Sequence, residues 1–254
     1  MNKFRYAIVL FILLLESCAS KKDVLYFQDS ILYESASVKY VNFMIQPGDI
    51  LSITVGAKVP ETVIPYNIQQ LGGNSFSNIE TIKLQGYLVS NQGTIIFPVL
   101  GTITVVNKTI SMLEQELKKI LECGGHLIEP TVSIRLLNAK VTVLGEVHKP
   151  GTYSFTEQRL TVPQALGYAG DLTINGKRKD IILIRESEGV RTIKHIDLTT
   201  TQWIDDPDYS IRQNDILIIN PNNSKVKTAG YIGNAATILT IASLILSTVI
   251  LLTR

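Results

Sequence analysis

Apolar and polar side chains alternate along much of the chain, and a period of two is typical of β-strands with one buried face. The clearest example is the segment 51–55, in which Leu51, Ile53 and Val55 alternate with Ser52 and Thr54. Two other segments predict helices, because they combine an apolar helical face or a helix-capping start with a closing glycine. The pattern therefore predicts an α+β fold, with strands at 86–98, 99–105, 130–136, 141–147, 181–185 and 190–196 and helices at 111–123 and 161–169.

Turn-forming residues separate these segments. In Pro47-Gly48-Asp49, proline presets φ at the first central position of a turn and glycine accepts a positive φ at the second. The short connection at Asn91-Gln92-Gly93 predicts a β-hairpin formed by the strands on either side. Ser111 and Glu114 fit a capping box at the start of the first helix. Residues 58–80 are rich in Asn, Gln, Gly, Ser and Pro, and they predict a long loop.

The segments 45–53 and 211–219 resemble each other. Each places an aspartate, Asp49 or Asp215, directly after a residue that tolerates left-handed backbone, and each then enters an apolar strand. Two interpretations are open. The segments are either two unrelated turns of a similar kind, or they have the same structural role in two subdomains.

The N-terminus has the features of a secretory signal. Lys3 and Arg5 give it a positive charge, and the apolar run 6–15 is too short to span a bilayer. Leu15-Glu16-Ser17-Cys18 is similar to a bacterial lipobox, although Glu16 occupies a position that is usually small or apolar. The preferred interpretation is that Cys18 becomes the acylated first residue of the mature chain. The alternative is a plain secretory signal with an incidental cysteine.

The C-terminal segment is the other membrane candidate. Residues 232–252 contain no charged side chain, and a helix of this length reaches roughly 30 Å. A spanning helix is therefore predicted over 229–252. Its small and polar residues gather on one side, which would allow close contact with neighbouring helices; this polar face comprises Gly233, Asn234, Thr237, Thr240 and Ser247. The alternative is a plain anchor, whose hydroxyl groups bond to their own backbone.

Composition narrows the function. The formal net charge of +2 gives no electrostatic case for nucleic-acid binding. The three histidines lack metal-ligand spacing, and no nucleophile motif or phosphate-binding loop occurs, so we expect no metal site, no cofactor and no catalytic residue. Asp205-Asp206-Pro207-Asp208 is expected to be a solvated acidic loop rather than a calcium site. If Cys18 is acylated, Cys123 has no partner for an intrachain disulfide.

Taken in order, these motifs resemble the Wza-type polysaccharide export family of outer-membrane lipoproteins. The first half matches in the turn at 47–49, Gly86-Tyr87, Leu100-Gly101 and the helix after Thr109. The second half resembles a soluble-ligand-binding β-grasp domain, with Ala169-Gly170, Arg185 and Asn214-Asp215 among its marks. Asn214 and Asp171 depart from the family pattern, because glycine is usual at both positions. The turn positions that carry the resemblance are Pro47, Gly48, Asp49, Gly93, Gly145, Pro150, Gly151 and Asp215.

The resemblance implies a division of the chain and a function. The expected parts are a signal peptide (1–17), a lipidated tether (18–42), an export domain (43–138), a β-grasp domain (139–221) and the spanning helix (229–252). The family further implies a ring of identical subunits that passes capsular or exopolysaccharide to the cell surface, together with an inner-membrane polysaccharide co-polymerase. Membrane lipid is a further expected partner. A non-channel binding lipoprotein and a structural adaptor are the alternatives.

Overall fold

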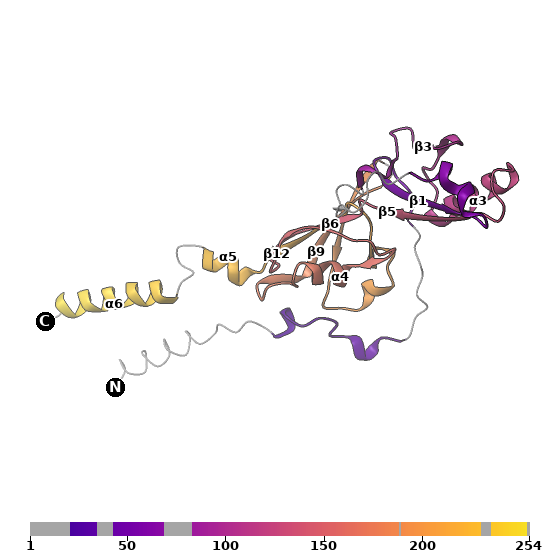
Figure 1. Ribbon diagram of the computed structural model, residues 1–254. Helices are drawn as coiled ribbons and strands as arrows, with labels where there is room; N and C mark the ends of the chain where they lie inside the picture. Colours follow the sequence, from indigo (N-terminus) through magenta and orange to yellow (C-terminus); the bar gives the residue numbers. More distant parts are fainter. Residues whose placement is uncertain (1–20, 35–42, 69–82, 188, 230–234, 253–254) are drawn as a thin grey trace.

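The computed structural model describes residues 21–34, 43–68, 83–187, 189–229 and 235–252. These residues form an elongated body, with a helix that extends from one end (Figure 1). The body contains a three-stranded sheet, a five-stranded sheet and two sheets of two strands. The strands are β1 (Ile50–Gly56), β2 (Tyr87–Leu88), β3 (Thr94–Phe97), β4 (Gly101–Thr104), β5 (Thr131–Leu136), β6 (Lys140–Gly145), β7 (Gly151–Ser154), β8 (Leu160–Thr161), β9 (Gly176–Ser187), β10 (Val190–Ile196), β11 (Ser210–Ile211) and β12 (Ile216–Pro221). The α-helices are α3 (Ile110–Cys123), α4 (Val162–Tyr168), α5 (Asn223–Ala229) and α6 (Ala235–Leu252). Short 3₁₀-helices are η1 (Lys21–Asp23), η2 (Ser30–Leu32), η3 (Pro60–Tyr66), η4 (Gln202–Asp205) and η5 (Pro207–Tyr209).

The N-terminal half is built on β1. This strand lies between β2 and β5 and pairs antiparallel with both, so that Leu51 faces Tyr87 on one side and Leu136 on the other. The helix α3 packs against β5 through Leu113 and Leu117, both fully buried. Burying such a leucine contributes about 1.5–3 kcal/mol. The helix therefore closes the core of this half.

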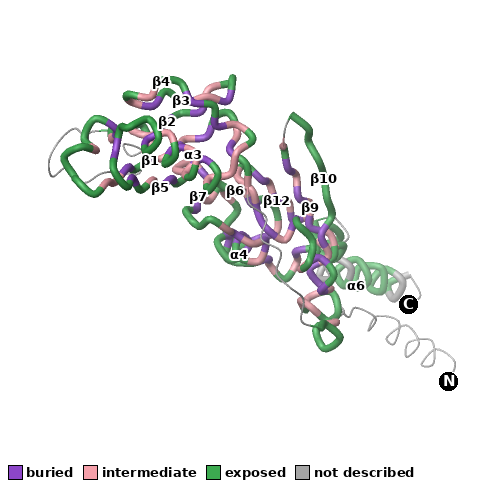
Figure 2. The backbone as a smooth tube through the Cα atoms, turned by 90° about the vertical axis from the view of Figure 1, so that its right-hand side faces the viewer, coloured by how far each residue is buried: buried purple, intermediate pink, exposed green. Residues whose placement is uncertain are grey.

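The C-terminal half is a five-stranded sheet in the order β10-β9-β12-β6-β7. The β9–β10 hairpin pairs Ile184 with Ile193, and β12 lies between β9 (antiparallel) and β6 (parallel). Along β6, β9 and β12, buried residues alternate with more exposed ones (Figure 2). The capping box of α4 is present, with Thr161 accepting from the Gln164 backbone and the Gln164 side chain accepting from the Thr161 N–H. The α+β class is confirmed.

Three local predictions were wrong in detail. The strands around Asn91-Gln92-Gly93 do not pair with each other: β2 joins β1, whereas β3 pairs with β4. The capping residue of α3 is Thr109, whose hydroxyl accepts from the Met112 N–H at 3.2 Å, so the helix begins before Ser111. Within the predicted loop, residues 60–66 form η3, and Asn67 holds it to β1 by bonding with the Val55 backbone. Residues 69–82 lie outside the described part of the chain.

The C-terminal segment differs from the prediction. Of the predicted helix over 229–252, residues 235–252 form α6, Ala229 ends the separate helix α5, and residues 230–234 lie outside the described part. Among the helices that the structure describes, none has both the length and the apolar character to cross a membrane. The predicted spanning helix is therefore not supported.

Candidate functional site

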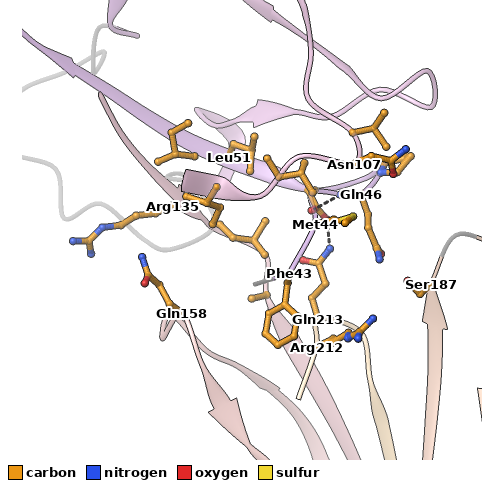
Figure 3. A pocket seen from close by; sticks show the side chains of 18 of the residues that line it. Phe43, Met44, Gln46, Leu51, Asn107, Arg135, Gln158, Ser187, Arg212 and Gln213 are labelled. Carbon is orange, nitrogen blue, oxygen red and sulfur yellow. Dashed lines mark hydrogen bonds between the residues drawn. The ribbon is translucent and has the colours of Figure 1, made fainter. Parts of the chain in front are cut away.

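A cleft of about 1140 Å³ lies where the two halves meet. The N-terminal half lines it with residues 43–49, part of β5 and the start of α3. The C-terminal half contributes residues 155–158, the tip of the β9–β10 hairpin and the turn before β12. In the view of Figure 3, Arg135 and Gln158 stand on the left, Phe43 and Gln213 near the centre, and Ser187 on the right. The cleft is larger than the roughly 300–1,000 Å³ of a typical small-molecule pocket.

The two similar turns of the sequence lie at this junction and have the same local geometry. Asp49 accepts the backbone N–H of Gln46 at 2.9 Å, and Asp215 accepts that of Arg212 at 2.8 Å. The residue before each aspartate has a left-handed φ, +86° for Gly48 and +62° for Asn214. Both carboxylates are buried and both turns lead into strands. The structure thus favours the interpretation of one role in two subdomains.

The turns are also joined to each other across the junction. The Gln213 amide donates to the Asp49 carboxylate, so the second turn contacts the first directly. Asn138, in the connection between the halves, donates to the Gly48 carbonyl at 2.9 Å and accepts from the Ile50 N–H at 2.9 Å. Burial raises the pKa of Asp49, while the hydrogen bonds from Gln46 and Gln213 oppose that rise. These bonds hold the two halves in a defined arrangement around the cleft.

A buried ion network supports the second turn. The Arg185 guanidinium, 6% exposed, makes two bonds to Asp215, at 3.0 and 2.6 Å. It also pairs with Asp208 and donates to the Ser210 carbonyl at 2.9 Å. Burial raises the pKa of the Asp215 carboxyl, and the bonds from Arg185 oppose it. The prediction of a solvated acidic loop was wrong for Asp208, because this carboxylate is buried by its pairing with Arg185.

Residues 21–34, here called the strap, lie along the C-terminal half (Figure 1). The backbone N–H groups of Phe27 and Gln28 donate to the carbonyls of Leu198 and Thr199, at 3.1 and 2.7 Å. The Phe27 ring stacks on Trp203 with centroids 5.8 Å apart. Tyr26 adds further contacts, because its hydroxyl donates to Asp171 at 2.6 Å and the Arg178 guanidinium lies over its ring. The sequence predicted a tether here, but the strap is folded onto the sheet.

The remaining predicted positions are dispersed. Gly93 and Gly145 both have a left-handed φ, +75° and +92°. Pro150 directly precedes β7, and Gly151 is the first residue of that strand. Of the proposed site residues that the structure describes, Pro47 and Asp49 line the cleft and the others do not. Cys18, Gly233 and Asn234 lie outside the described residues, as does the side chain of Thr237.

The hydroxyl groups of Ser243, Ser247 and Thr248 bond within their own helix, α6. Ser243 donates to the Thr240 carbonyl at 2.9 Å, and Ser247 donates to the Ser243 carbonyl at 2.7 Å. This is the arrangement of the plain-anchor alternative. The apolar side chains are exposed, with Leu244 at 69% and Leu251 at 81%. The described part of α6 therefore presents apolar surface that no other described segment covers.

Two family models match successive parts of the chain. Residues 38–137 match the family described as polysaccharide biosynthesis/export protein, and residues 140–194 match the SLBB domain. The chain belongs to the polysaccharide export family. Family membership thus rests on both halves of the described body. The matched family is one of export proteins and not an enzyme family.

Two curated relatives extend this finding. Both are named EPS I polysaccharide export outer membrane protein EpsA. The protein of Ralstonia solanacearum is 28% identical over 218 residues, which cover 84% of this chain and 57% of the relative. The protein of Ralstonia nicotianae is 31% identical over 210 residues, which cover 79% of this chain and 53% of the relative. The chain thus spans a little over half the length of these relatives.

Sequence reasoning missed the cleft, the strap and the partners of Arg185. One signal was present for the last: Arg185 ends an apolar run at 181–184, and a charged side chain on a buried strand needs a paired carboxylate. For the strap, the one signal was its pair of adjacent aromatic residues, Tyr26 and Phe27. The segment shows no period that would predict a helix or a strand. The cleft had no signal, because it arises from the way in which two separate halves meet.

Proposed function

We propose that this chain is an outer-membrane polysaccharide export protein, which moves capsular or exopolysaccharide from the periplasm to the cell surface. The observation that carries the proposal is the succession of an export domain and an SLBB domain on one chain, aligned with relatives named for export at the outer membrane. The export domain would extend over residues 43–138 and the β-grasp domain over 139–221. Transport of a finished polymer requires no bond-making, which agrees with assignment to an export family.

The strap supports an orientation for the molecule. Only Ala19 and Ser20 separate Cys18 from the folded strap, and Lys179 pairs with Asp23 of η1 at 2.8 Å. An acylated Cys18 would therefore hold the β-grasp domain close to the lipid surface, with the export domain further into the periplasm. Replacing Cys18 with serine should abolish acyl labelling and leave unprocessed precursor. Normal processing of the Cys18→Ser chain would exclude the lipobox.

We also propose that identical subunits assemble into a ring. The exposed apolar residues of α6 would contact other copies or lipid, because leaving them in water costs about 25 cal/mol per Å² of apolar surface. An inner-membrane polysaccharide co-polymerase is the proposed partner at the periplasmic end. The mass of detergent-extracted full-length protein, compared with a chain ending before Tyr231, tests this part. A large discrete particle that is lost on truncation is the expected result.

A second candidate function is a non-channel lipoprotein that binds a glycan. The cleft between the halves favours it, because a binding protein needs such a site in each subunit. Deletion of the gene distinguishes the two candidates. Loss of surface polysaccharide, restored by the reintroduced gene, is expected for an exporter. Unchanged surface polysaccharide in the deleted strain would overturn the export proposal.

A further inference from the structure

The first residues of β9 hold both the strap and the C-terminal helices. Asp23 of the strap pairs with Lys179 of β9 at 2.8 Å. Pro221, the last residue of β12, pairs with Gly176, the first residue of β9. The helix α5 begins two residues after Pro221, and α6 extends beyond it from this end of the body (Figure 1). The segments that lead to both ends of the chain are therefore attached to one end of the β-grasp sheet.

The first turn of α5 is fixed to this end of the sheet. The side chain of Asn222 accepts the Lys225 N–H at 3.0 Å, and the backbone N–H of Asn222 donates to the Asn175 carbonyl at 2.7 Å. The Lys225 ammonium pairs with Glu146, which also accepts the Thr173 hydroxyl at 2.9 Å. The bond from Lys225 holds the pKa of Glu146 below its usual value, so this carboxylate stays ionised at neutral pH. The start of α5 consequently has a defined position on the body.

Two branched apolar side chains are exposed at this attachment. Ile174 is 65% exposed and Val226 is 58% exposed. Asn222 bonds to both residues, because its side-chain amide donates to the Ile174 carbonyl at 3.5 Å and its carbonyl accepts the Val226 N–H at 3.2 Å. Together with the exposed apolar residues of α6, this pair extends apolar surface from the C-terminal helix onto the folded body.

Lysines occur on each segment of this end. Lys21 lies in η1, Lys177 lies in β9, and Lys225 and Lys227 flank Val226 on α5. A lysine lays its methylene stem along apolar surface and keeps its ammonium group at the polar edge. Apolar residues bordered by lysines are typical of surfaces that lie in the interface of a bilayer. A contact between the same surfaces of two copies would instead bring like charges together.

Carboxylates occupy some of these lysines and leave others. Lys177 pairs with Asp180 at 2.6 Å, as Lys179 and Lys225 pair with their own carboxylates. Lys21 and Lys227 are exposed and pair with no carboxylate of the described residues. Their ammonium groups are therefore available to the phosphates of phospholipid headgroups.

We propose that this end of the β-grasp domain rests on a phospholipid bilayer, with Ile174 and Val226 in contact with lipid and with Lys21 and Lys227 at the headgroup phosphates. This inference rests on the proposed function at the outer membrane, and it adds a membrane-contact surface on the folded body. The contact is interfacial, so it requires no helix that crosses the bilayer.

The test places an environment-sensitive dye at single cysteines of the full-length chain. Cys123→Ser removes the exposed native thiol, and Ile174→Cys or Val226→Cys introduces the thiol that is labelled. Each chain is reconstituted into vesicles of phosphatidylethanolamine and phosphatidylglycerol, with or without a lipid that is spin-labelled near its headgroup. The Cys123→Ser chain without an added cysteine measures any labelling at Cys18.

The dye at either position should lose about half of its fluorescence in the spin-labelled vesicles, because an interfacial apolar face lies roughly 5–10 Å into the headgroup boundary. Ile64→Cys and Ile96→Cys are the matched controls, since these residues are 54% and 80% exposed and lie in the export domain. The dye at the control positions should lose little fluorescence. Thermal unfolding of each variant verifies that the fold is retained.

The absence of quenching at positions 174 and 226, or equal quenching at the two controls, would overturn the proposal. A dye that is shielded at 174 and 226 but is not quenched by the spin-labelled lipid would also overturn it, because that result indicates contact with another copy of the chain. The export proposal is decided separately. Loss of surface polysaccharide in the deleted strain, together with no quenching, removes only the membrane-contact surface.

Discussion

Backbone conformation explains two residues that stand where the resemblance to the export family predicts glycine. Asn214 and Asp171 both stand where glycine is common, and both have a left-handed φ, +62° and +68°. Asparagine and aspartate adopt this conformation more readily than other residues with a side chain. Asp171 also gains a contact that glycine lacks, the hydroxyl of Tyr26 in the strap. The substitutions thus preserve the backbone and, at Asp171, add a bond to the N-terminal segment.

Gly145 gives the most local prediction. Its φ is +92°, and a Cβ at this position would lie 2.0 Å from the carbonyl oxygen of Ile219 on β12. Gly145→Ala should therefore lower the free energy of unfolding by more than about 1–2 kcal/mol, because the backbone penalty and the clash add. Gly167→Ala is the control, since its Cβ would meet nothing within 4 Å. Denaturant titration should find Gly167→Ala as stable as the wild type or slightly more stable. An equal loss of unfolding free energy in both variants would contradict this explanation.

At the scale of elements, the strap connects the predicted lipid position to the β-grasp sheet. Burial and the Asp171 carboxylate raise the pKa of Tyr26 above its ordinary value of 10.0. A group whose folded pKa is raised contributes stability that is complete below the unfolded pKa and is lost as pH rises through the folded pKa. Attachment of the strap should therefore weaken only in strongly alkaline solution.

Trp203, the only tryptophan of the chain, reports this change because Phe27 stacks on it. We expect its fluorescence to shift as pH rises well above 10. Tyr26→Phe should remove this step, because phenylalanine has no hydroxyl to ionise. Burial raises the pKa of Tyr87 to about 12, and global unfolding that follows ionisation of Tyr87 should be the same in both proteins. A step of equal size in both proteins would exclude the strap as its source.

The sequence predicted elements better than it predicted their partners. Alternation located β1 and β5, because each has one face against a core. The apolar run at 181–184 located β9, and the turn after it located β10, which is exposed except at Ile196. The strand β2 was found, but its pairing was assigned to β3 instead of β1, since a turn signal reports proximity along the chain and not in space. The cleft and the strap depend on contacts between residues more than 100 positions apart, such as those of Gln213 with Asp49 and Tyr26 with Asp171. Periodicity carries no information about such contacts.

At the scale of the molecule, two turns of one kind join two domains. Gln213→Ala should lower the free energy of unfolding by about 1–3 kcal/mol, because the buried Asp49 carboxylate loses a donor. Gln115→Ala, on an exposed helix face, should have little effect. Hydrogen exchange should also become faster at the Ile50 and Asn214 amides, which bond across the connection at 138–140. Unchanged exchange and stability would mean that the junction is held by other contacts.

If the chain moves polysaccharide outward, its loss should change where the polymer is found. Cells depleted of the protein would be separated into surface and periplasmic fractions, and the polysaccharide in each would be measured over time. The account predicts that surface polymer falls while polymer accumulates in the periplasm. A fall in total polymer without any periplasmic accumulation would contradict it, because that result indicates a role in synthesis rather than in export.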